Sequence, residues 1–199
     1  MSKQLAQHSS LTAEHYSPPL IVEPARRVLG GIDLDPASCH AGNEVVKAAT
    51  IFTSSGLLLD WSWQGMPTRV FLNPPGGKLN SRDEVVSAGP GRSHAAAWWA
   101  KLHEEWIAGH VSAAIFVCFS LSIFRTAQGE RGIPPPFAYP FCVPAARVNY
   151  DKLDENGARV ATSGAPADSA IVFLPNVEHR ARHEAAFAQE FRALGAVRL

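Results

Sequence analysis

The chain has 199 residues, of which 46% are hydrophobic and 18% are charged, and its formal net charge at pH 7 is zero. This length and composition are typical of a globular protein with one domain of ordinary size, and they exclude disorder for most of the chain. Because its charges balance, the protein exerts no overall attraction on nucleic acid or an acidic membrane, and any DNA contact must come from a local patch.

The N-terminal stretch, residues 1–15, is polar and aperiodic, so we expect it to be flexible and to precede a single domain at 16–199. The first predicted helix covers 18–29, "PPLIVEPARRVL", whose apolar residues recur at helical spacing. Ser17 is the expected N-cap. Prolines in the first turn do little harm, whereas Pro24 is expected to kink or divide the helix.

Apolar runs predict the strands. "IDLD" at 32–35 follows two glycines that end the first helix, and it is predicted to be a short strand. "TRVFL" at 68–72 and the nearly all-apolar "VSAAIFVCF" at 111–119 are typical of buried strands. Between the first two of these runs, residues 44–52 are compatible with helix or irregular structure, and "GLLLDWSW" at 56–63 with a buried strand or a loop anchored by aromatic residues.

Helices alternate with these strands. In chain order, the remaining predictions are a helix from Ser93 to Gly109, a helix near 121–128, strands within 141–150 and 169–175, and a closing helix at 178–194. Such alternation, ending in a strand pair, predicts an α/β, Rossmann-like domain. Its sheet should have mostly parallel strands, helices on both faces and an antiparallel pair at the edge.

Cysteine and histidine positions give no sign of a disulfide framework or a metal site. Cys39, Cys118 and Cys142 lie far apart, and the eight histidines show no ligand spacing. The N-terminus lacks the apolar core of a signal peptide, and no run approaches the roughly 18 apolar residues of a membrane span. We therefore expect a cytoplasmic protein with free thiols, no metal and no membrane partner.

Polar residues follow two of the predicted strands, and ligands of open α/β sheets bind beyond the carboxyl ends of strands. Asp33 and Asp35 end the first strand, followed by Pro36 and the small Ala37, which let a ligand come close. Only one of the two aspartates is expected to point into the site. A helix cap or a solvated loop acid is the alternative for either.

The strand at 68–72 runs directly into Asn73, Pro74 and Pro75. Proline locks its own φ near −65° and restricts the residue before it, so this backbone is stiff, and neither proline has an N–H. What remains is a set of acceptors, namely the side-chain oxygen of Asn73 and the carbonyls of Asn73 and Pro74. Such a set suits an amino group on an aromatic ring. An Asn-Pro turn that only ends the strand is the alternative.

Three stretches together resemble the phage-type DNA N-6-adenine methyltransferases. They are "HYSPPLIVEPARRVLGGIDLDPAS", "TIFTSSGLLLDW" and "VFLNPPGGK", and the resemblance is strongest from Tyr16 to Lys78. "YSPPLIV" resembles the segment before the cofactor motif of amino-methylating DNA enzymes, and "LDPAS" resembles a shortened form of that motif. "NPP" resembles their catalytic tetrapeptide, in which an aromatic residue follows the prolines.

The resemblance implies a Rossmann-like enzyme that uses S-adenosylmethionine to methylate the N6 amino group of adenine in DNA. It implies catalytic roles for Asn73, Pro74 and Pro75. The implied cofactor-binding residues are Tyr16, Pro18, Asp33, Asp35, Pro36 and Ala37, and the implied substrate-binding residues are Phe71, Gly76 and Lys78. Because the amino group is paired inside duplex DNA, the adenine must be flipped out of the helix. A phage or prophage setting in a bacterial cell also follows from the resemblance.

The sequence departs from the family pattern in two places. Gly76 stands where the aromatic residue is expected, and "SCHAG" replaces a glycine-rich loop after the cofactor motif. Stacking is worth about 1–3 kcal/mol per base, so another aromatic would have to supply it. Phe71, Trp98 and Trp99 are the candidates, with core packing as the alternative for the tryptophans. Lys78 is a candidate phosphate contact or else a solvated loop lysine.

Other functions stay open on the sequence alone. The same acceptors would serve a different amino or amide group, such as cytosine N4 or a protein glutamine side chain. The domain could instead be a non-catalytic DNA- or protein-binding module that kept the fold and lost the stacking aromatic. The predicted closing helix mixes arginines with glutamates, which indicates an ordinary surface rather than a basic DNA-binding face.

Overall fold

The computed structural model describes residues 15–54, 56–76, 94–127, 132–154, 156–162 and 167–199. The helices of this part are α1 (Pro19–Leu29), α2 (His40–Val46), α3 (His94–Ile107), α4 (Ile123–Thr126) and α5 (Arg180–Phe191), with a short 3-10 helix at Pro136–Ala138. The strands are β1 (Leu34–Asp35), β2 (Thr50–Ile51), β3 (Thr68–Leu72), β4 (Val111–Cys118), β5 (Phe141–Pro144), β6 (Asp151–Leu153), β7 (Arg159–Ala161), β8 (Ala170–Leu174) and β9 (Gly195–Arg198). The flexible terminus expected at 1–15 lies outside the described residues except for His15.

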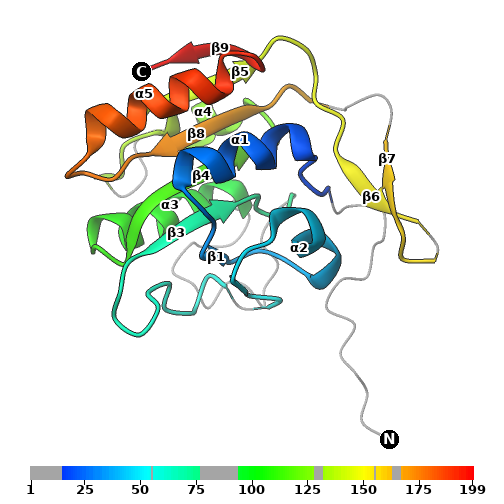
Figure 1. Ribbon diagram of the computed structural model, residues 1–199, viewed down its shortest axis with the longest axis horizontal. Coiled ribbons are helices and arrows are strands. Elements are labelled where there is room, and N and C mark those ends of the chain that lie inside the picture. Colours follow the sequence, from blue (N-terminus) through cyan, green and yellow to red (C-terminus); the bar gives the residue numbers. More distant parts are fainter. Residues whose placement is uncertain (1–14, 55, 77–93, 128–131, 155, 163–166) are drawn as a thin grey trace, which may run out of the picture.

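Seven strands form one sheet in the order β2-β1-β3-β4-β8-β5-β9 (Figure 1). The neighbours from β2 to β4 are parallel, whereas β8, β5 and β9 pair antiparallel. The α/β class and the mixed sheet are therefore confirmed. The antiparallel part is larger than the predicted pair, because β9 at the chain's end adds to β5. The segment between the last two predicted strands also holds a separate hairpin, β6–β7, which periodicity did not indicate.

The helix α1 shows how local sequence sets an element's ends. Its N-cap is Pro18, so the prediction of Ser17 as the cap is wrong, and Gly30 ends the helix in the left-handed region at φ 70°. The helix also continues through Pro24 and is not divided there. The carbonyl that loses its partner to this proline belongs to Leu20, a residue that is 58% exposed, where water can replace the missing bond.

Alternation along the central strands sends side chains to two apolar clusters, one on each face of the sheet. On β3, Val70 and Leu72 pack with the helix α3, whereas Phe71 packs with α1 and α5. Helices thus cover both faces, as predicted. Each fully buried phenylalanine or leucine contributes about 1.5–3 kcal/mol to folding, so these strands are held firmly and their ends are fixed in space. No helix of the described residues is long and apolar enough to span a membrane.

Candidate functional site

The ends of β1 and β3 lie side by side. These strands are parallel neighbours, with Leu34 paired to Val70, so Asp35 at the end of β1 lies close to the residues that follow Leu72. From β1 the chain moves to β2 on one side and later to β3 on the other. Such a reversal of direction is the topological switch point, where open α/β sheets bind their ligands.

Asp33 is fully engaged by Arg69 on the neighbouring strand. Its Oδ2 accepts bonds from the backbone N–H and the Nε of Arg69, both at 2.8 Å, and its Oδ1 lies 2.6 Å from Nη2. The hydrogen bonds and charge of this guanidinium lower the pKa of Asp33 against the opposing effect of burial. Asp33 therefore joins the two strands through its bonds to Arg69, and its role in holding a cofactor stays a prediction.

Asp35 has the opposite environment. It is only 4% exposed, and burial raises its pKa to about 7. Bonds from the Ser38 hydroxyl and from the N–H of Ala37, at 3.2 Å, lower the pKa but offset burial only in part. A carboxyl that titrates near neutral pH at a strand end is typical of a functional position. Of the two aspartates, Asp35 is thus the one whose carboxyl has no cationic partner in the described part of the chain.

The turn after Asp35 is rigid. The carbonyl of Asp35 accepts the N–H of Phe52, and the carbonyl of Phe52 accepts the N–H of Ser38, both at 3.1 Å. Pro36 is buried, and its carbonyl packs so closely on Gly56 that a Cβ there would lie 1.9 Å from the oxygen. Only glycine fits at that contact. The turn containing Pro36 and Ala37 is therefore held in one shape without a ligand.

The side-chain NH₂ group of Asn73 is hydrogen-bonded within the protein. Its Nδ2 donates to the carbonyl of His15 at 2.8 Å, and the side chain is partly exposed rather than turned into the core. Within the described residues no donor reaches its Oδ1. Pro74 is buried and Pro75 is exposed. The anchoring bond sets the orientation of the carboxamide and leaves the Oδ1 as an acceptor.

Gly76 and Lys78 follow this corner. Gly76 is exposed, and no atom of the described residues lies within 4 Å of where its Cβ would be. Open space thus adjoins the position of the missing aromatic residue. Lys78, the predicted phosphate contact, lies outside the described residues.

The segment from His15 to Pro18 joins the two strand ends. The carbonyl of His15 holds Asn73 at one end. At the other, the ring of Tyr16 packs on Gly42 of α2, and its hydroxyl lies 3.5 Å from the thiol of Cys39. Tyr16 and Pro18, both predicted to bind the cofactor, therefore lie in a segment that runs from Asn73, which follows β3, to the residues that follow β1.

Two buried polar atoms in this segment have no protein partner among the described residues. They are the Oγ of Ser17, in a residue 3% exposed, and the Nδ1 of His15. Leaving such an atom unsatisfied costs about 1–3 kcal/mol, which a polar ligand would remove. Sequence reasoning named Ser17 only as a helix cap and missed His15. The one signal was their place directly before Pro18, at the start of the resembling segment.

The proposed aromatic replacements for the missing stacking residue lie in the core. Phe71 is 0% exposed and points to the α1 and α5 face, because alternation along β3 turns it away from Leu72. Trp98 and Trp99 belong to α3, are 5% and 1% exposed, and pack in the apolar cluster that this helix forms with the sheet. None of the three offers a surface to a base. The prediction that Phe71 binds substrate is therefore wrong, and core packing holds for both tryptophans.

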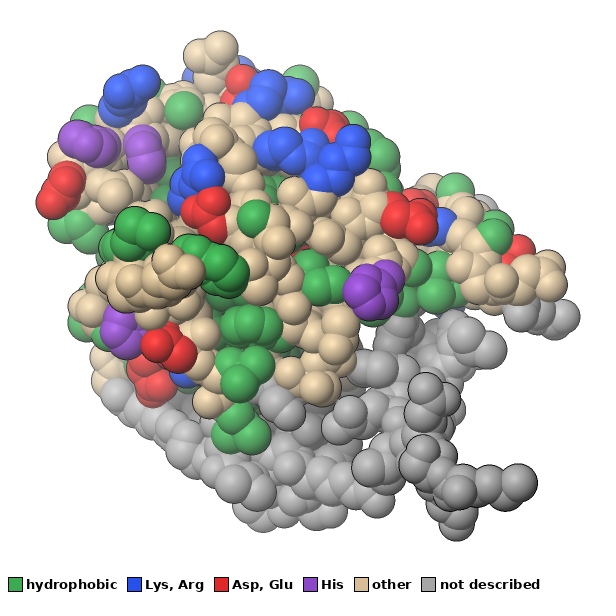
Figure 2. Space-filling model, turned by 60° about the horizontal axis from the view of Figure 1, so that its bottom comes forward, with side chains coloured by type: hydrophobic (Ala, Val, Ile, Leu, Met, Phe, Trp, Pro, Cys, Tyr) green, Lys and Arg blue, Asp and Glu red, His purple; other side chains and the backbone are tan. Residues whose placement is uncertain are grey.

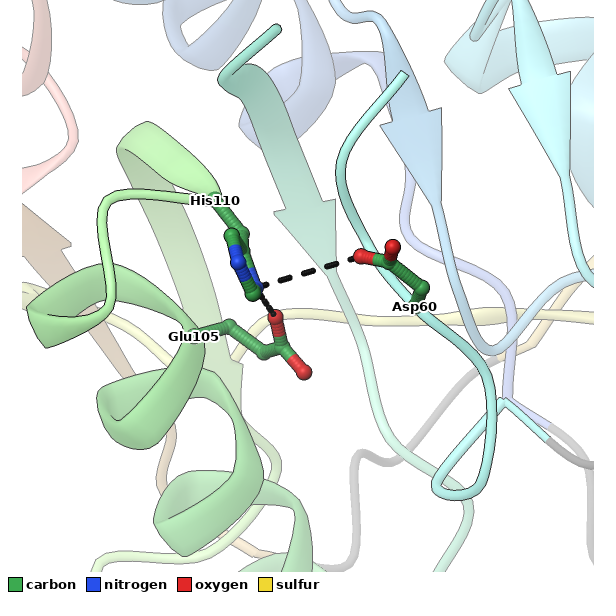
Figure 3. Close-up of side chains that lie close together, drawn as sticks. All are labelled: Asp60, Glu105 and His110. Carbon is green, nitrogen blue, oxygen red and sulfur yellow. Dashed lines mark hydrogen bonds and ion pairs between the residues drawn. The ribbon is translucent and has the colours of Figure 1, made fainter. Parts of the chain in front are cut away.

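An ionic cluster lies at the opposite ends of the strands (Figure 3). Glu105 of α3 accepts from His110 Nδ1 at 2.7 Å and also pairs with Lys101, while Asp60 lies 3.9 Å from the same His110 nitrogen. The ligand atoms of Asp60, Glu105 and His110 are within 4.8 Å of one another, close enough to share a cation. Both oxygens of Glu105 are already bound by protein groups, so the cluster serves as an ionic clamp between α3 and β4. Sequence spacing did not indicate it.

Charges on the described surface are mixed. In Figure 2, Lys and Arg side chains lie among Asp and Glu side chains on the face in view. On α5, Arg180 pairs with Glu184 at 2.7 Å, and Glu190 pairs with Arg27 of α1 at 2.5 Å. This agrees with the expectation of an ordinary surface on the closing helix.

No protein-family model and no curated protein matches this chain. The site must therefore be interpreted from its own geometry and from the sequence resemblance.

Proposed function

We propose that this protein is an S-adenosylmethionine-dependent DNA methyltransferase of Rossmann-like fold that methylates the N6 amino group of adenine. The observation that carries the proposal is the anchored carboxamide of Asn73, which donates through Nδ2 to His15 and keeps its Oδ1 as an acceptor at the switch point of the sheet. The motif resemblance from Tyr16 to Lys78 supports the same assignment.

The residues at the two strand ends suit the implied cofactor. Asp35 offers a buried carboxyl that ligand donors would keep ionised, and the unpartnered Ser17 Oγ offers a further polar contact. Tyr16 and the turn of Pro36 and Ala37 form preorganised walls that need no ordering when a ligand arrives. When bound, S-adenosylmethionine supplies an electrophilic methyl group to this space.

Asn73 and Pro74 act on the target nitrogen. The Oδ1 of Asn73 and the carbonyl of Pro74 accept the two hydrogens of an aromatic amino group, which draws the nitrogen lone pair out of conjugation with the ring. Since these acceptors are fixed before the reaction, they provide orientation and electrostatic stabilisation without reorganisation. No strong base is required, because the nitrogen loses its proton only after it has become positively charged.

Gly76 favours a second candidate function. The open space at this position lacks the aromatic that the resembling family places there. A non-catalytic DNA- or protein-binding module, which keeps the fold without stacking a base, would show this feature. The two candidates differ in whether the protein transfers a methyl group at all. A different amino or amide acceptor, such as cytosine N4 or protein glutamine, is a variant of the first candidate.

Transfer of a tritiated methyl group to unmethylated DNA, followed by nucleoside analysis, tests the proposal and identifies the base. We expect N6-methyladenine with the native protein and a loss of about 100- to 1,000-fold in rate with Asn73→Ala, the usual effect of removing one preorganised polar group. Asn156→Ala, which changes an exposed asparagine in the β6–β7 turn, is the matched control and should retain full activity.

The remaining outcomes separate the candidates. Stabilisation by S-adenosylmethionine in a thermal shift assay without transfer to DNA would indicate another acceptor. If S-adenosylmethionine does not stabilise the protein and no methyl group is transferred, the proposal is overturned in favour of the binding module.

A further inference from the structure

Phe119 stands at the carboxyl end of β4, the strand next to β3. It directly follows the last residue of β4, the parallel neighbour of β3. The register pairs Leu72, the residue before Asn73, with Phe116, so Asn73 and Phe119 both follow the carboxyl ends of neighbouring parallel strands. An aromatic side chain thus stands one strand away from the place where the resembling family has one in sequence.

The ring of Phe119 already stacks against a planar heteroaromatic side chain. The imidazole of His15 stacks on it with ring centroids 4.5 Å apart and planes 17° apart. Tyr150 closes one side, edge-on to Phe119 at 4.9 Å, and its hydroxyl is held by Ser169 at 3.0 Å. Because the backbone carbonyl of His15 binds Asn73, this stack borders the acceptors of the proposed catalytic corner.

The imidazole of His15 lacks a hydrogen bond at one of its nitrogens. Its Nδ1 is buried and has no partner among the described residues. Burial, and to a lesser extent the charge of Lys152, lowers the pKa of His15, so the ring is neutral at pH 7. A neutral imidazole that moved into water would regain hydrogen bonds at Nδ1, which makes its displacement inexpensive. Its backbone carbonyl could stay on Asn73 during such a movement of the side chain.

We propose that Phe119 is the stacking surface for the flipped adenine, and that the imidazole of His15 occupies this surface until the base displaces it. The inference rests on the proposed function. Adenine is a planar heteroaromatic group with a larger ring face than imidazole, so it gains more from the same phenyl surface. A base seated there would have its edge toward Asn73, which explains how the chain manages with Gly76.

Two substitutions with opposite expected effects test this. Phe119→Leu keeps an apolar side chain but removes the ring face, so kcat/KM for DNA should fall about 10-fold or more, mainly through KM. The melting temperature shift caused by S-adenosylmethionine should not change. His15→Ala removes the competing ring and keeps the backbone carbonyl that holds Asn73, so kcat/KM for DNA should rise. Phe124→Leu, which alters a partly buried aromatic in the cluster on the α3 face, is the matched control and should change neither value.

A spectroscopic measurement adds a readout that does not depend on activity. The ring protons of His15 should resonate upfield because they lie over Phe119, and the signal is assigned by its absence in His15→Ala. Adding a short single-stranded oligodeoxyadenylate should move this signal toward the position of an exposed histidine. In Phe119→Leu the signal should start near that position and should not move.

The failures of the two proposals can be told apart. If the native protein methylates no DNA, the proposed function falls and this inference with it. If the native protein methylates adenine but Phe119→Leu keeps its KM, or His15→Ala loses activity as Phe119→Leu does, only the inference is overturned. In the second case the imidazole would be a fixed part of the site rather than an occupant that leaves.

Discussion

At the amino-terminal ends of the parallel strands the polar side chains are paired, whereas at the carboxyl ends several have no protein partner among the described residues. Asp33 binds Arg69 through both oxygens, and Glu105 holds His110 and Lys101. At the other ends, the Oγ of Ser17 and the Nδ1 of His15 are buried without partners, and Asp35 is buried with a raised pKa.

The difference separates the end of the sheet whose polar groups are paired from the end at which we propose that a ligand binds. Paired charges stabilise a fold, while unsatisfied buried groups cost free energy unless a ligand completes them. The switch point of the sheet lies at the carboxyl ends of the strands, where these unsatisfied groups are found and where ligands of such sheets bind. Asp33 and Asp35 make the comparison sharpest, because they are two residues apart and differ only in what surrounds them.

The largest effect in this comparison is expected at Asp35. Burial raises its pKa to about 7, and ligand donors favour the ionised form. The affinity for S-adenosylmethionine should therefore rise between pH 6 and pH 8, measured by calorimetry. Asp35→Asn should bind at least about 10-fold more weakly at pH 8, the usual effect of losing a charge-assisted hydrogen bond, and should lose most of the pH dependence.

The same substitution should have a separate effect on stability. The folded pKa of Asp35 lies above its ordinary value of 3.8, so its burial makes the free energy of unfolding fall as the pH rises from about 4 to about 7. Asp35→Asn should remove this decline and should not be less stable than the native protein at pH 8. Equal affinity of both proteins for the cofactor would contradict a ligand role for Asp35.

A smaller effect is expected at Asp33, where the free energy of unfolding should depend on pH in the opposite direction. Its pKa is lowered by Arg69, so the pair stabilises the fold above the ordinary pKa of the carboxyl, and this stability is lost as the pH falls through the lowered value. Asp33→Asn should reduce the free energy of unfolding by about 1 kcal/mol at pH 7, since the partly exposed pair is screened by water. Urea denaturation measures this.

The matched control for Asp33 is another aspartate–arginine pair, Asp168 with Arg147, in which both side chains are 58% exposed. Asp168→Asn should leave the stability nearly unchanged. Loss of cofactor affinity in Asp33→Asn without loss of stability would reverse the roles assigned to the two aspartates.

The smallest effect is expected at the ionic cluster. His110→Ala removes one partner of Glu105, but Lys101 remains to neutralise the carboxylate. The free energy of unfolding should fall by about 0.5 kcal/mol, measured in urea, and methyl transfer should be unchanged. A loss of transfer in this variant would show that the paired ends of the strands also take part in function.

Much of the fold could be predicted from local pattern. Residues 68–72 form a strand with the predicted bounds, and β4 ends one residue before the predicted end, because continuous apolar runs are stable only when both faces are covered. The short strands β2 and β9 were missed. Each has few residues and no alternation of its own, and it becomes a strand only because β1 or β5 offers a free edge.

The candidate site was predictable only in part. Asn73 and Asp35 could be found because each follows a buried run and precedes a proline. The occupation of Asp33 by Arg69 depends on the register between β1 and β3, which neither segment encodes alone. The contacts of His15 with Phe119 and Asn73 likewise join residues from three distant parts of the chain.

The amino-acid sequence by itself determined where the chain is buried, where it turns, and which polar residues stand at the turns, because these depend on neighbours along the chain. Only the tertiary structure decided which of those polar residues have partners. Satisfaction of a buried hydrogen-bonding group depends on strands and loops that meet across the sheet. That meeting paired Asp33 with Arg69, and it left the Oγ of Ser17 and the Oδ1 of Asn73 without a partner among the described residues.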